Sequence, residues 1–397
     1  KNTIIFIKNK NFFPGILYFL FKRKKFITGG NMKKIFLWGY WAKNFGDDLF
    51  LKVYLDQMKE ANINTYILTE KKYKKFYEEM GVKVVSKDSF IYKLSYKILT
   101  MCRKPELYFW LVNKRSLFVL LGGSLFAENK GTLAEQKQFL NLDYATTKAE
   151  KSFVIGSNFG PYIHEKFKKE YEALFGEMED VVFRDKMSYE LFNKTLKNVR
   201  YAPDIAFEGR WEENKKSSNS IVISVINVEH RQELATHKEI YEKGIADICL
   251  YHIHRNEKVF LLSLCEQEGD ILACQRIYEM LNQQDKRFIE MINYNSIDRT
   301  IELLASAKKI YATRFHALMM ALYFHKNVVP IIYNEKGINA IESYCRSLKW
   351  FSIENFNEDT LLQMTKIDQT AELELPDSKQ FQGLLKYCRI GWCDNDI

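Results

Sequence analysis

A permanent cation and an ionisable imidazole stand two residues apart in the segment Thr313-Arg314-Phe315-His316. Apolar residues 309–312 before it predict a strand, and the apolar run 317–324 after it predicts a helix. Strand-to-helix junctions bind anions in α/β proteins, and histidine exchanges a proton near neutral pH. We therefore expect Arg314 to hold an anion and His316 to act as an acid, although His316 taken alone fits a packed structural histidine better.

A glycine-containing turn, residues 39–48 (GYWAKNFGDD), follows the first predicted strand of the folded body. Gly39 allows a tight turn, and Asn44 and Asp47 suit turn and helix-cap positions. The segment lacks both the glycine spacing of dinucleotide sites and the Lys-Ser/Thr pair of a P-loop, which disfavours those two kinds of site. On its own, this turn is as consistent with a plain connection as with a binding site.

Two further glycine turns end neighbouring predicted strands. The first contains Gly122, Gly123 and Ser124, and the second contains Asn158 and leads to His164. Carboxyl ends of parallel strands form the ligand-binding edge of an open α/β sheet. Three such turns predict a cleft more strongly than any one of them, and His164 is expected to reach it.

Two charged residues follow later strands. Arg184 ends the predicted strand 181–183, where it either pairs with a neighbour such as Asp185 or faces a ligand. Asp204, within residues 202–206 (APDIA), is either a buried turn-former or a carboxylate of the cleft. Spacing alone leaves both alternatives open.

Short apolar strands alternate with amphipathic helices from residue 33 onward, which predicts parallel α/β layers with crossover helices. The polar stretch 212–219 interrupts this alternation, which restarts at residue 221. We therefore predict two Rossmann-like α/β domains that face a cleft, with the acceptor side in the first. The expected segments are an N-terminal extension (1–31), an N-terminal domain (32–211), a C-terminal domain (220–350) and C-terminal helices that pack back on the N-terminal domain (351–397).

The net charge of +9 is concentrated at the start of the chain. Residues 1–31 contain seven Lys or Arg and no acid, which leaves +2 for the remaining residues and argues against nucleic-acid binding. The apolar run 12–21 is too short to span a bilayer; with the basic residues 22–25 it is either an interfacial anchor or, as we favour, an extension outside the domain. The seven cysteines are odd in number and contain no Cys-x-x-Cys pair, so we expect a reducing, cytoplasmic compartment.

The ordered set of motifs resembles the polysaccharide pyruvyl transferases. The resemblance covers most of the body and leaves out residues 1–31 and about the last fifty. One departure is Gly156-Ser157-Asn158, where related sequences often carry Gln, and it concerns recognition of the acceptor. The matching pieces, in chain order, are Gly39, Asn44-Phe45-Gly46-Asp47, Gly122-Gly123-Ser124, Gly160-Pro161, Arg184, Pro203-Asp204 and Arg314-Phe315-His316.

This resemblance implies a GT-B-like fold and transfer of the enolpyruvyl unit of phosphoenolpyruvate to two hydroxyls of a hexose, with no further cofactor and no metal. Arg184 and Arg314 would hold the two anionic groups, with Lys336 as a third ligand, and His316 would protonate the methylene carbon. The acceptor would be a hexose-containing glycan, lipid-linked or free, at the inner face of the membrane. The residues expected around it are Gly39, Asn44, Asp47, Gly122, Gly123, Ser124, Asn158, His164 and Asp204.

Two other functions fit the same fold. One is a GT-B glycosyltransferase that uses a sugar nucleotide, although Glu335 and Glu342 are seven residues apart rather than the eight common in such enzymes. The other is a non-catalytic partner in polysaccharide assembly that contacts the membrane surface through residues 12–25. We rank both below the pyruvyl transferase.

Overall fold

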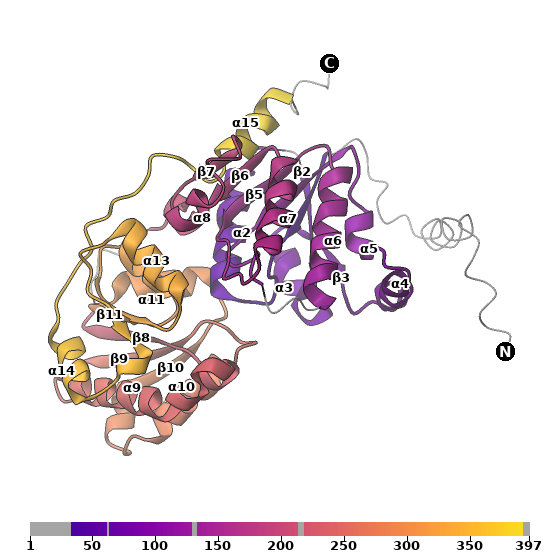
Figure 1. Ribbon diagram of the computed structural model, residues 1–397. Helices are drawn as coiled ribbons and strands as arrows, with labels where there is room; N and C mark the ends of the chain where they lie inside the picture. The colour runs from indigo at the N-terminus through magenta and orange to yellow at the C-terminus, as the bar shows by residue number, and fades with distance from the viewer. Residues whose placement is uncertain (1–32, 62, 129–132, 213–217, 392–397) are drawn as a thin grey trace.

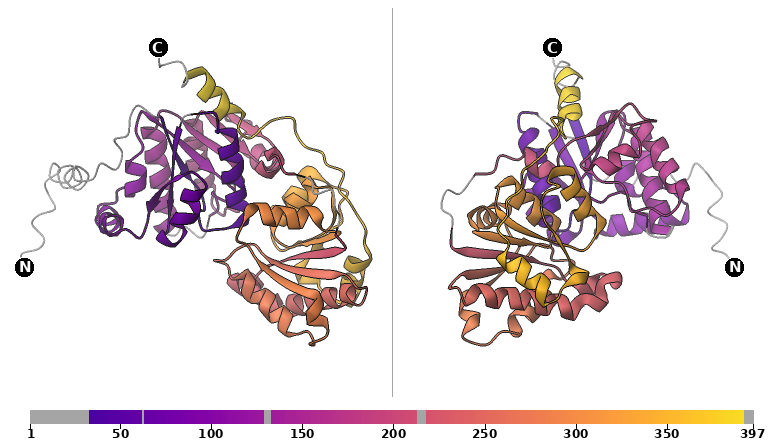
Figure 2. Two further views of the ribbon diagram at one scale, coloured as in Figure 1. Left: turned by 180° about the vertical axis from the view of Figure 1, so that it is seen from behind. Right: turned by 60° about the vertical axis from the view of Figure 1, so that its left-hand side comes forward.

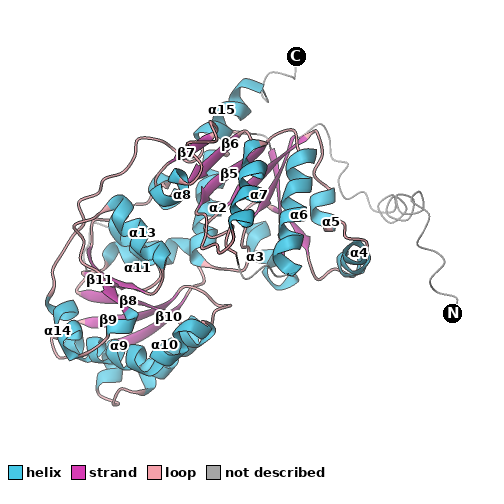
Figure 3. Ribbon diagram, viewed as in Figure 1, coloured by secondary structure: helices cyan, strands magenta, loops and turns pink. Residues whose placement is uncertain are grey.

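The computed structural model describes residues 33–61, 63–128, 133–212 and 218–391. It contains two domains, each a parallel β-sheet covered by helices (Figures 1 and 3). The predicted fold class is therefore confirmed. The predicted N-terminal extension, residues 1–31, lies outside the described residues.

The N-terminal domain has a seven-stranded parallel sheet in the order β3-β2-β1-β4-β5-β6-β7. Its strands are β1 (Lys33–Trp38), β2 (Ile63–Thr69), β3 (Lys83–Ser86), β4 (Ser116–Leu121), β5 (Ser152–Ser157), β6 (Asp180–Phe183) and β7 (Val199–Tyr201). Its helices are α2 (Phe45–Gln57), α3 (Lys74–Glu79), α4 (Phe90–Met101), α5 (Leu107–Trp110), α6 (Leu133–Lys148), α7 (Glu165–Gly176) and α8 (Lys186–Glu190), followed by the 3-10 turn η3 (Ile205–Glu208).

The C-terminal domain has a six-stranded parallel sheet in the order β10-β9-β8-β11-β12-β13. Its strands are β8 (Ser220–Val225), β9 (Lys258–Ser263), β10 (Ile289–Asn293), β11 (Lys309–Ala312), β12 (Asn327–Ile332) and β13 (Phe351–Ser352). Its helices are α9 (Lys238–Ile253), α10 (Asp270–Glu279), α11 (Ile297–Ser306), α12 (Phe315–Tyr323), α13 (Glu335–Tyr344) and α14 (Glu358–Lys366).

The central strands are mostly apolar because both faces of each sheet are buried. In β4, for example, Val119 faces a core shared with α2, whereas Phe118 and Leu120 face a second core on the opposite side of the sheet. The first core continues into the C-terminal domain, where it includes residues of α11 and α12. A continuous apolar core therefore joins the two domains.

The strand order reverses direction between β1 and β4 in the first sheet and between β8 and β11 in the second. Ligands of open α/β sheets bind outside the carboxyl ends of the strands at such a switch point. The motifs of the sequence follow the carboxyl ends of β1, β4, β11 and their neighbours. The topology thus places the residues predicted for a site at the edges that bind ligands.

The C-terminal segment is divided between the domains. Helix α14 packs against α9 in the C-terminal domain, and α15 (Gln382–Gly391) lies on the N-terminal domain (Figures 1 and 2). Gln380 fixes the segment before α15 to the N-terminal domain. Its Oε1 accepts a hydrogen bond from Gly156 N at 2.8 Å, and its Nε2 donates to Ala202 O at 3.1 Å and Pro203 O at 2.8 Å. The buried amide therefore ties the end of the chain to β5 and to the loop after β7.

The sequence analysis missed three strands. They are β7, β10 and β13, each of which lies at the edge of a sheet and pairs with one neighbour. Because β13 pairs with β12, the C-terminal domain also extends beyond residue 350, where the sequence analysis ended it. Within the described ranges, no helix is both long enough and apolar enough to cross a bilayer.

Candidate functional site

A cleft of about 490 Å³ lies between the domains, at the carboxyl ends of their central strands. Helices α2, α12 and α13 begin at residues that line it, so the partial positive charge of each helix N-terminus faces the cleft. A second hollow, of about 700 Å³, lies between η3 and α15 and is lined by none of the predicted site residues. The first cleft is therefore the candidate site.

The turn after β1 supplies the N-terminal wall. Asn44 caps α2 by accepting a hydrogen bond from Gly46 N at 3.4 Å, and its Nδ2 donates to Asp47 Oδ2 at 2.7 Å. Gly122, whose φ is +123°, allows the β4 turn to approach Asp47, since a Cβ there would lie 3.3 Å from Asp47 Oδ1. Burial raises the pKa of the Asp47 carboxyl to about 7, against the lowering effect of Lys336 and Arg184.

Arg184 lies behind this wall, with 2% of its side chain exposed. Its Nη1 donates to Asp204 Oδ2 at 3.0 Å and its Nη2 donates to Asn158 Oδ1 at 2.8 Å. A Cβ on Gly123 would approach Arg184 Nη2 to 3.0 Å, so glycine lets the loop pass over the guanidinium. The structure thus resolves the two open alternatives: Arg184 pairs with Asp204 rather than with Asp185, and Asp204 is fully buried.

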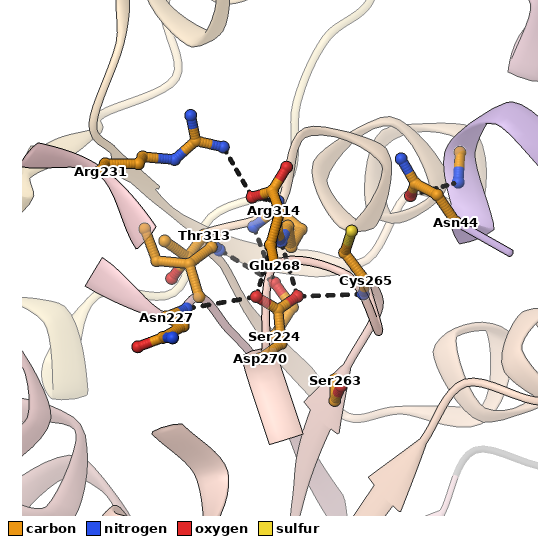
Figure 4. Close-up of polar contacts among 12 residues, drawn as sticks. Asn44, Ser224, Asn227, Arg231, Ser263, Cys265, Glu268, Asp270, Thr313 and Arg314 are labelled. Carbon is orange, nitrogen blue, oxygen red and sulfur yellow. Dashed lines mark hydrogen bonds and ion pairs between the residues drawn. The ribbon is translucent and has the colours of Figure 1, made fainter. Parts of the chain in front are cut away.

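Arg314 precedes α12 and is held by two carboxylates (Figure 4). Its Nε donates to Asp270 Oδ2 at 2.8 Å, its Nη2 donates to Asp270 Oδ1, and its Nη1 donates to Glu268 Oε2 at 2.8 Å. Ser224, in β8, fixes the backbone by accepting hydrogen bonds from Thr313 N and Arg314 N, both at 3.0 Å. Arg314 is therefore a rigid part of the wall whose charge is largely neutralised.

Sequence reasoning missed Arg231, Glu268 and Asp270. Glu268 Oε2 also accepts a hydrogen bond from Arg231 Nη2 at 2.8 Å, so this carboxylate bridges two arginines (Figure 4). A signal for the two acids was present, because residues 265–270 (CEQEGD) follow a predicted strand at the same edge of the sheet as Arg314. Arg231 follows a short 3-10 turn and carried no comparable signal.

His316, in the first turn of α12, points toward α2. Its ring meets Phe50 and Phe315 edge-on, with centroid distances of 4.9 and 5.1 Å, and a Cβ on Gly46 would lie 1.8 Å from Nδ1. Its Nε2 is buried and has no hydrogen-bond partner among the described residues. Burial, together with the charges of Lys336 and two arginines, holds the pKa of His316 well below its usual value, so the ring is neutral when the cleft is empty.

Lys336 lies in the first turn of α13. Its Nζ is 4.3 Å from the centroid of the Phe315 ring, and Arg184 Cζ is 4.5 Å from the same centroid. Burial, and next the charge of Arg184, lowers the pKa of the Lys336 ammonium to about 7. No ion pair to Lys336 is found in the part of the chain that the structure describes.

The fixed charges of the site cancel. Arg184 is paired with Asp204, and two further arginines are paired with Glu268 and Asp270. Among the other residues that line the cleft, burial shifts the pKa values of Asp47, His316 and Lys336 toward their neutral forms. The empty cleft therefore carries little net charge near pH 7, although it is built from charged side chains.

The structure brings most of the predicted site residues together. Arg184, Asp204, Asn158 and Gly122 support the lining from behind. His164, the N-cap of α7, lies apart from the lining, and its Nδ1 is 2.6 Å from Glu128 Oε1. His164 therefore does not reach the cleft as expected. The predicted residues that line the cleft are Gly39, Asn44, Asp47, Gly123, Ser124, Arg314, His316 and Lys336.

Solved structures share this two-domain arrangement. A UDP-GlcNAc 2-epimerase from Methanocaldococcus jannaschii superimposes with a TM-score of 0.57 and 13% identity, covering 90% of this chain and 98% of that one. The S. aureus MnaA–UDP co-structure gives a TM-score of 0.54 and 12% identity, covering 90% and 96%. At such identities the likeness concerns the fold, which is that of the GT-B glycosyltransferases and related epimerases.

Sequence comparison identifies the family. The amylovoran biosynthesis protein AmsJ of Erwinia amylovora is 24% identical over 246 residues, which cover 56% of this chain and 58% of AmsJ. The family model for polysaccharide pyruvyl transferases matches residues 44–335. That match extends from the N-cap of α2 to the first residue of α13, and so includes most residues that line the cleft, though not Gly39 or Lys336. The chain therefore belongs to the polysaccharide pyruvyl transferase family.

Proposed function

We propose that this protein transfers a pyruvyl group from phosphoenolpyruvate to two hydroxyls of a hexose in a cell-surface polysaccharide or its precursor, forming a cyclic ketal and releasing phosphate. The observation that carries the proposal is the convergence of three helix N-termini, Lys336 and the unpartnered Nε2 of His316 in one cleft. Family membership supports the reaction class, and the cleft supports the donor.

The N-termini of two helices and the remaining N–H groups of a guanidinium would bind phosphoenolpyruvate. Phosphoenolpyruvate carries a carboxylate and a phosphate, and the starts of α12 and α13 favour such anions. Arg314 donates three of the five N–H groups of a guanidinium to Asp270 and Glu268, which leaves two for a ligand. Arg231 extends the same wall, and Lys336 supplies a cation that no carboxylate of the described chain pairs.

Arg184 would act at a distance. It is nearly fully buried behind Gly123, and its charge contributes to the lowered pKa values of both His316 and Lys336. A bound trianion would oppose this lowering of the pKa values, because its negative charge stabilises the protonated forms of both side chains. Phosphoenolpyruvate would therefore raise the pKa values of the residues that bind it and react with it.

His316 would supply the first proton. In its protonated form it would transfer a proton to the methylene carbon of the donor, which makes the adjacent carbon oxocarbenium-like and open to attack by a sugar hydroxyl. The bond between that carbon and the phosphate oxygen then breaks, and phosphate leaves with the electron pair. The second hydroxyl closes the ketal; one of the two hydroxyl protons restores His316, and the other leaves with the phosphate.

The N-terminal wall would bind the hexose. Gly39, Ser124 and Gln138 line the cleft on the side opposite Arg314 and Lys336 and offer a close backbone approach, a hydroxyl and an amide. Asp47 lies at the boundary between the two walls, and its pKa of about 7 rises further beside the bound trianion. In that protonated form its carboxyl would donate a hydrogen bond to a hexose hydroxyl.

Incubation with phosphoenolpyruvate and a panel of hexosides tests the reaction, with phosphate release and the ketal as readouts. We expect His316→Ala to abolish both while its unfolding temperature stays near that of the wild type. His254→Ala, at an exposed histidine, is the matched control and should retain full activity. Turnover of a nucleotide sugar with no response to phosphoenolpyruvate would instead support a glycosyltransferase.

A further inference from the structure

Helix α4 leaves an apolar stripe uncovered. Phe90, Leu94 and Met101 are 80%, 40% and 77% exposed, and their spacing of four and seven residues places them on one face. The opposite face carries Tyr92 and Leu99, which are buried in the core of the N-terminal domain. Both faces of α4 are therefore apolar, but only one is packed against the protein.

Basic side chains flank the exposed stripe. The segment 90–104 (FIYKLSYKILTMCRK) contains four Lys or Arg and no acidic residue. Lys93 forms an ion pair with Asp88 at 3.5 Å, whereas Lys97, Arg103 and Lys104 have no ion pair among the described residues. Helical spacing places Lys93 and Lys97 beside Phe90 and Met101 rather than on the buried face.

We propose that this stripe and its flanking cations bind the surface of an anionic lipid bilayer, with α4 lying parallel to it. An exposed apolar face bordered by Lys and Arg is the pattern of a helix that lies in a membrane interface. The charge identifies the occupant: a lipid surface with anionic headgroups complements the cations, whereas the buried core of a protein partner would leave several of them unpaired. The inference is argued from α4 alone and does not require the proposed reaction.

The position of α4 gives the contact a direction. It begins four residues after β3, at the same edge of the sheet as the cleft, and it lies on the side of the N-terminal domain away from the C-terminal domain (Figure 1). A bilayer under α4 would thus contact the N-terminal domain on its side away from the C-terminal domain.

Vesicle sedimentation with the full chain tests the proposal. We expect binding to vesicles of phosphatidylcholine with about a third phosphatidylglycerol, and much weaker binding to pure phosphatidylcholine. The triple change Phe90→Ser, Leu94→Ser and Met101→Ser should lower the partition coefficient about a hundredfold. Lys93→Gln with Lys97→Gln should lower it about 25-fold, since each basic residue near an anionic surface contributes about fivefold.

Two control variants remove the same kinds of side chain, apolar and basic, at sites outside α4. Leu272→Ser with Met280→Ser removes two apolar side chains, in α10 and at its C-cap, that are each 51% exposed. Lys194→Gln with Lys197→Gln removes two exposed cations after α8. Both should bind anionic vesicles as the wild type does. Because all the replaced side chains are exposed, we expect unchanged unfolding temperatures, which separates lost binding from misfolding.

Hydrogen exchange locates the contact within the full chain. Anionic vesicles should slow exchange in residues 90–104. Protection confined to residues 1–31, or α4 variants that bind as the wild type does, would overturn the proposal. A dimer in solution that the triple α4 variant converts to a monomer would also overturn it, since the stripe would then serve contact between two copies of the chain.

Discussion

Binding of phosphoenolpyruvate should be coupled to uptake of protons, because the fixed charges of the cleft cancel. The empty site holds a Lys336 ammonium and an Asp47 carboxyl whose pKa values are both about 7. A bound trianion favours the protonated form of each group and raises both pKa values. Protons therefore promote binding, and affinity must fall as pH rises through the pKa values of the empty site.

The size of the effect follows from these values. Consider one group with a pKa of 7 in the empty site and a much higher pKa in the complex. The apparent dissociation constant is then proportional to one plus the ratio of unprotonated to protonated group in the empty site. It should increase about fivefold from pH 7 to pH 8 and about fiftyfold from pH 7 to pH 9. The second ionisation of a phosphate ester, near pH 6, is complete over this range and does not oppose the trend.

Calorimetry in two buffers of different ionisation enthalpy measures the protons taken up. We expect about half a proton per titrating group at pH 7 and about one at pH 9. The double variant Lys336→Arg with Asp47→Asn should bind with much weaker pH dependence, since arginine stays charged and asparagine does not titrate. Lys186→Arg, at an exposed lysine, should behave as the wild type. Wild-type affinity that stays constant between pH 7 and pH 9 would refute the reasoning.

Three further substitutions test contacts that hold the site and the C-terminal segment in place. Asp270→Asn should lower the free energy of unfolding by about 3 kcal/mol in urea titrations, because this fully buried carboxylate is a partner of Arg314. Gly46→Ala should cut phosphate release at least tenfold and lower the free energy of unfolding by about 1–3 kcal/mol, since the added Cβ displaces the buried His316 ring. Gln380→Ala should cost about 1–3 kcal/mol in the same titrations, because it leaves buried backbone groups of β5 and the loop after β7 without partners.

Each of these changes has a matched control. Asp298→Asn removes a carboxylate whose side chain is 80% exposed and should cost less than about 0.5 kcal/mol. Gly176→Ala adds a Cβ that meets its nearest neighbour at 3.5 Å and should leave activity intact. Lys379→Ala tests the residue next to Gln380 at an exposed position. A control that is as damaging as its partner would contradict the role assigned to the specific contact.

Local sequence signals were sufficient for the central strands and for the strand-end turns that contribute to the cleft lining. Strands such as β1, β4 and β5 are mainly apolar runs that end in turns, so local periodicity is enough to predict them. Parallel strands bring all their carboxyl ends to one edge, so the turns at Gly39 and Gly123 and the start of α12 could be assigned to one cleft. The short edge strands β7 and β10 escaped prediction because each depends on a single neighbouring strand.

The sequence by itself determined which side chains stand at the carboxyl ends of the central strands, because strand-end positions follow from local periodicity. Only the tertiary structure decided their charges: Arg184 meets Asp204 across 20 residues, and Arg314 meets Asp270 across 44. It likewise decided which apolar residues of α4 stay exposed, since periodicity identifies an amphipathic helix without identifying the face that packs. Ion pairing and burial depend on segments distant in the sequence, and they set the pKa values on which the chemistry of this cleft depends.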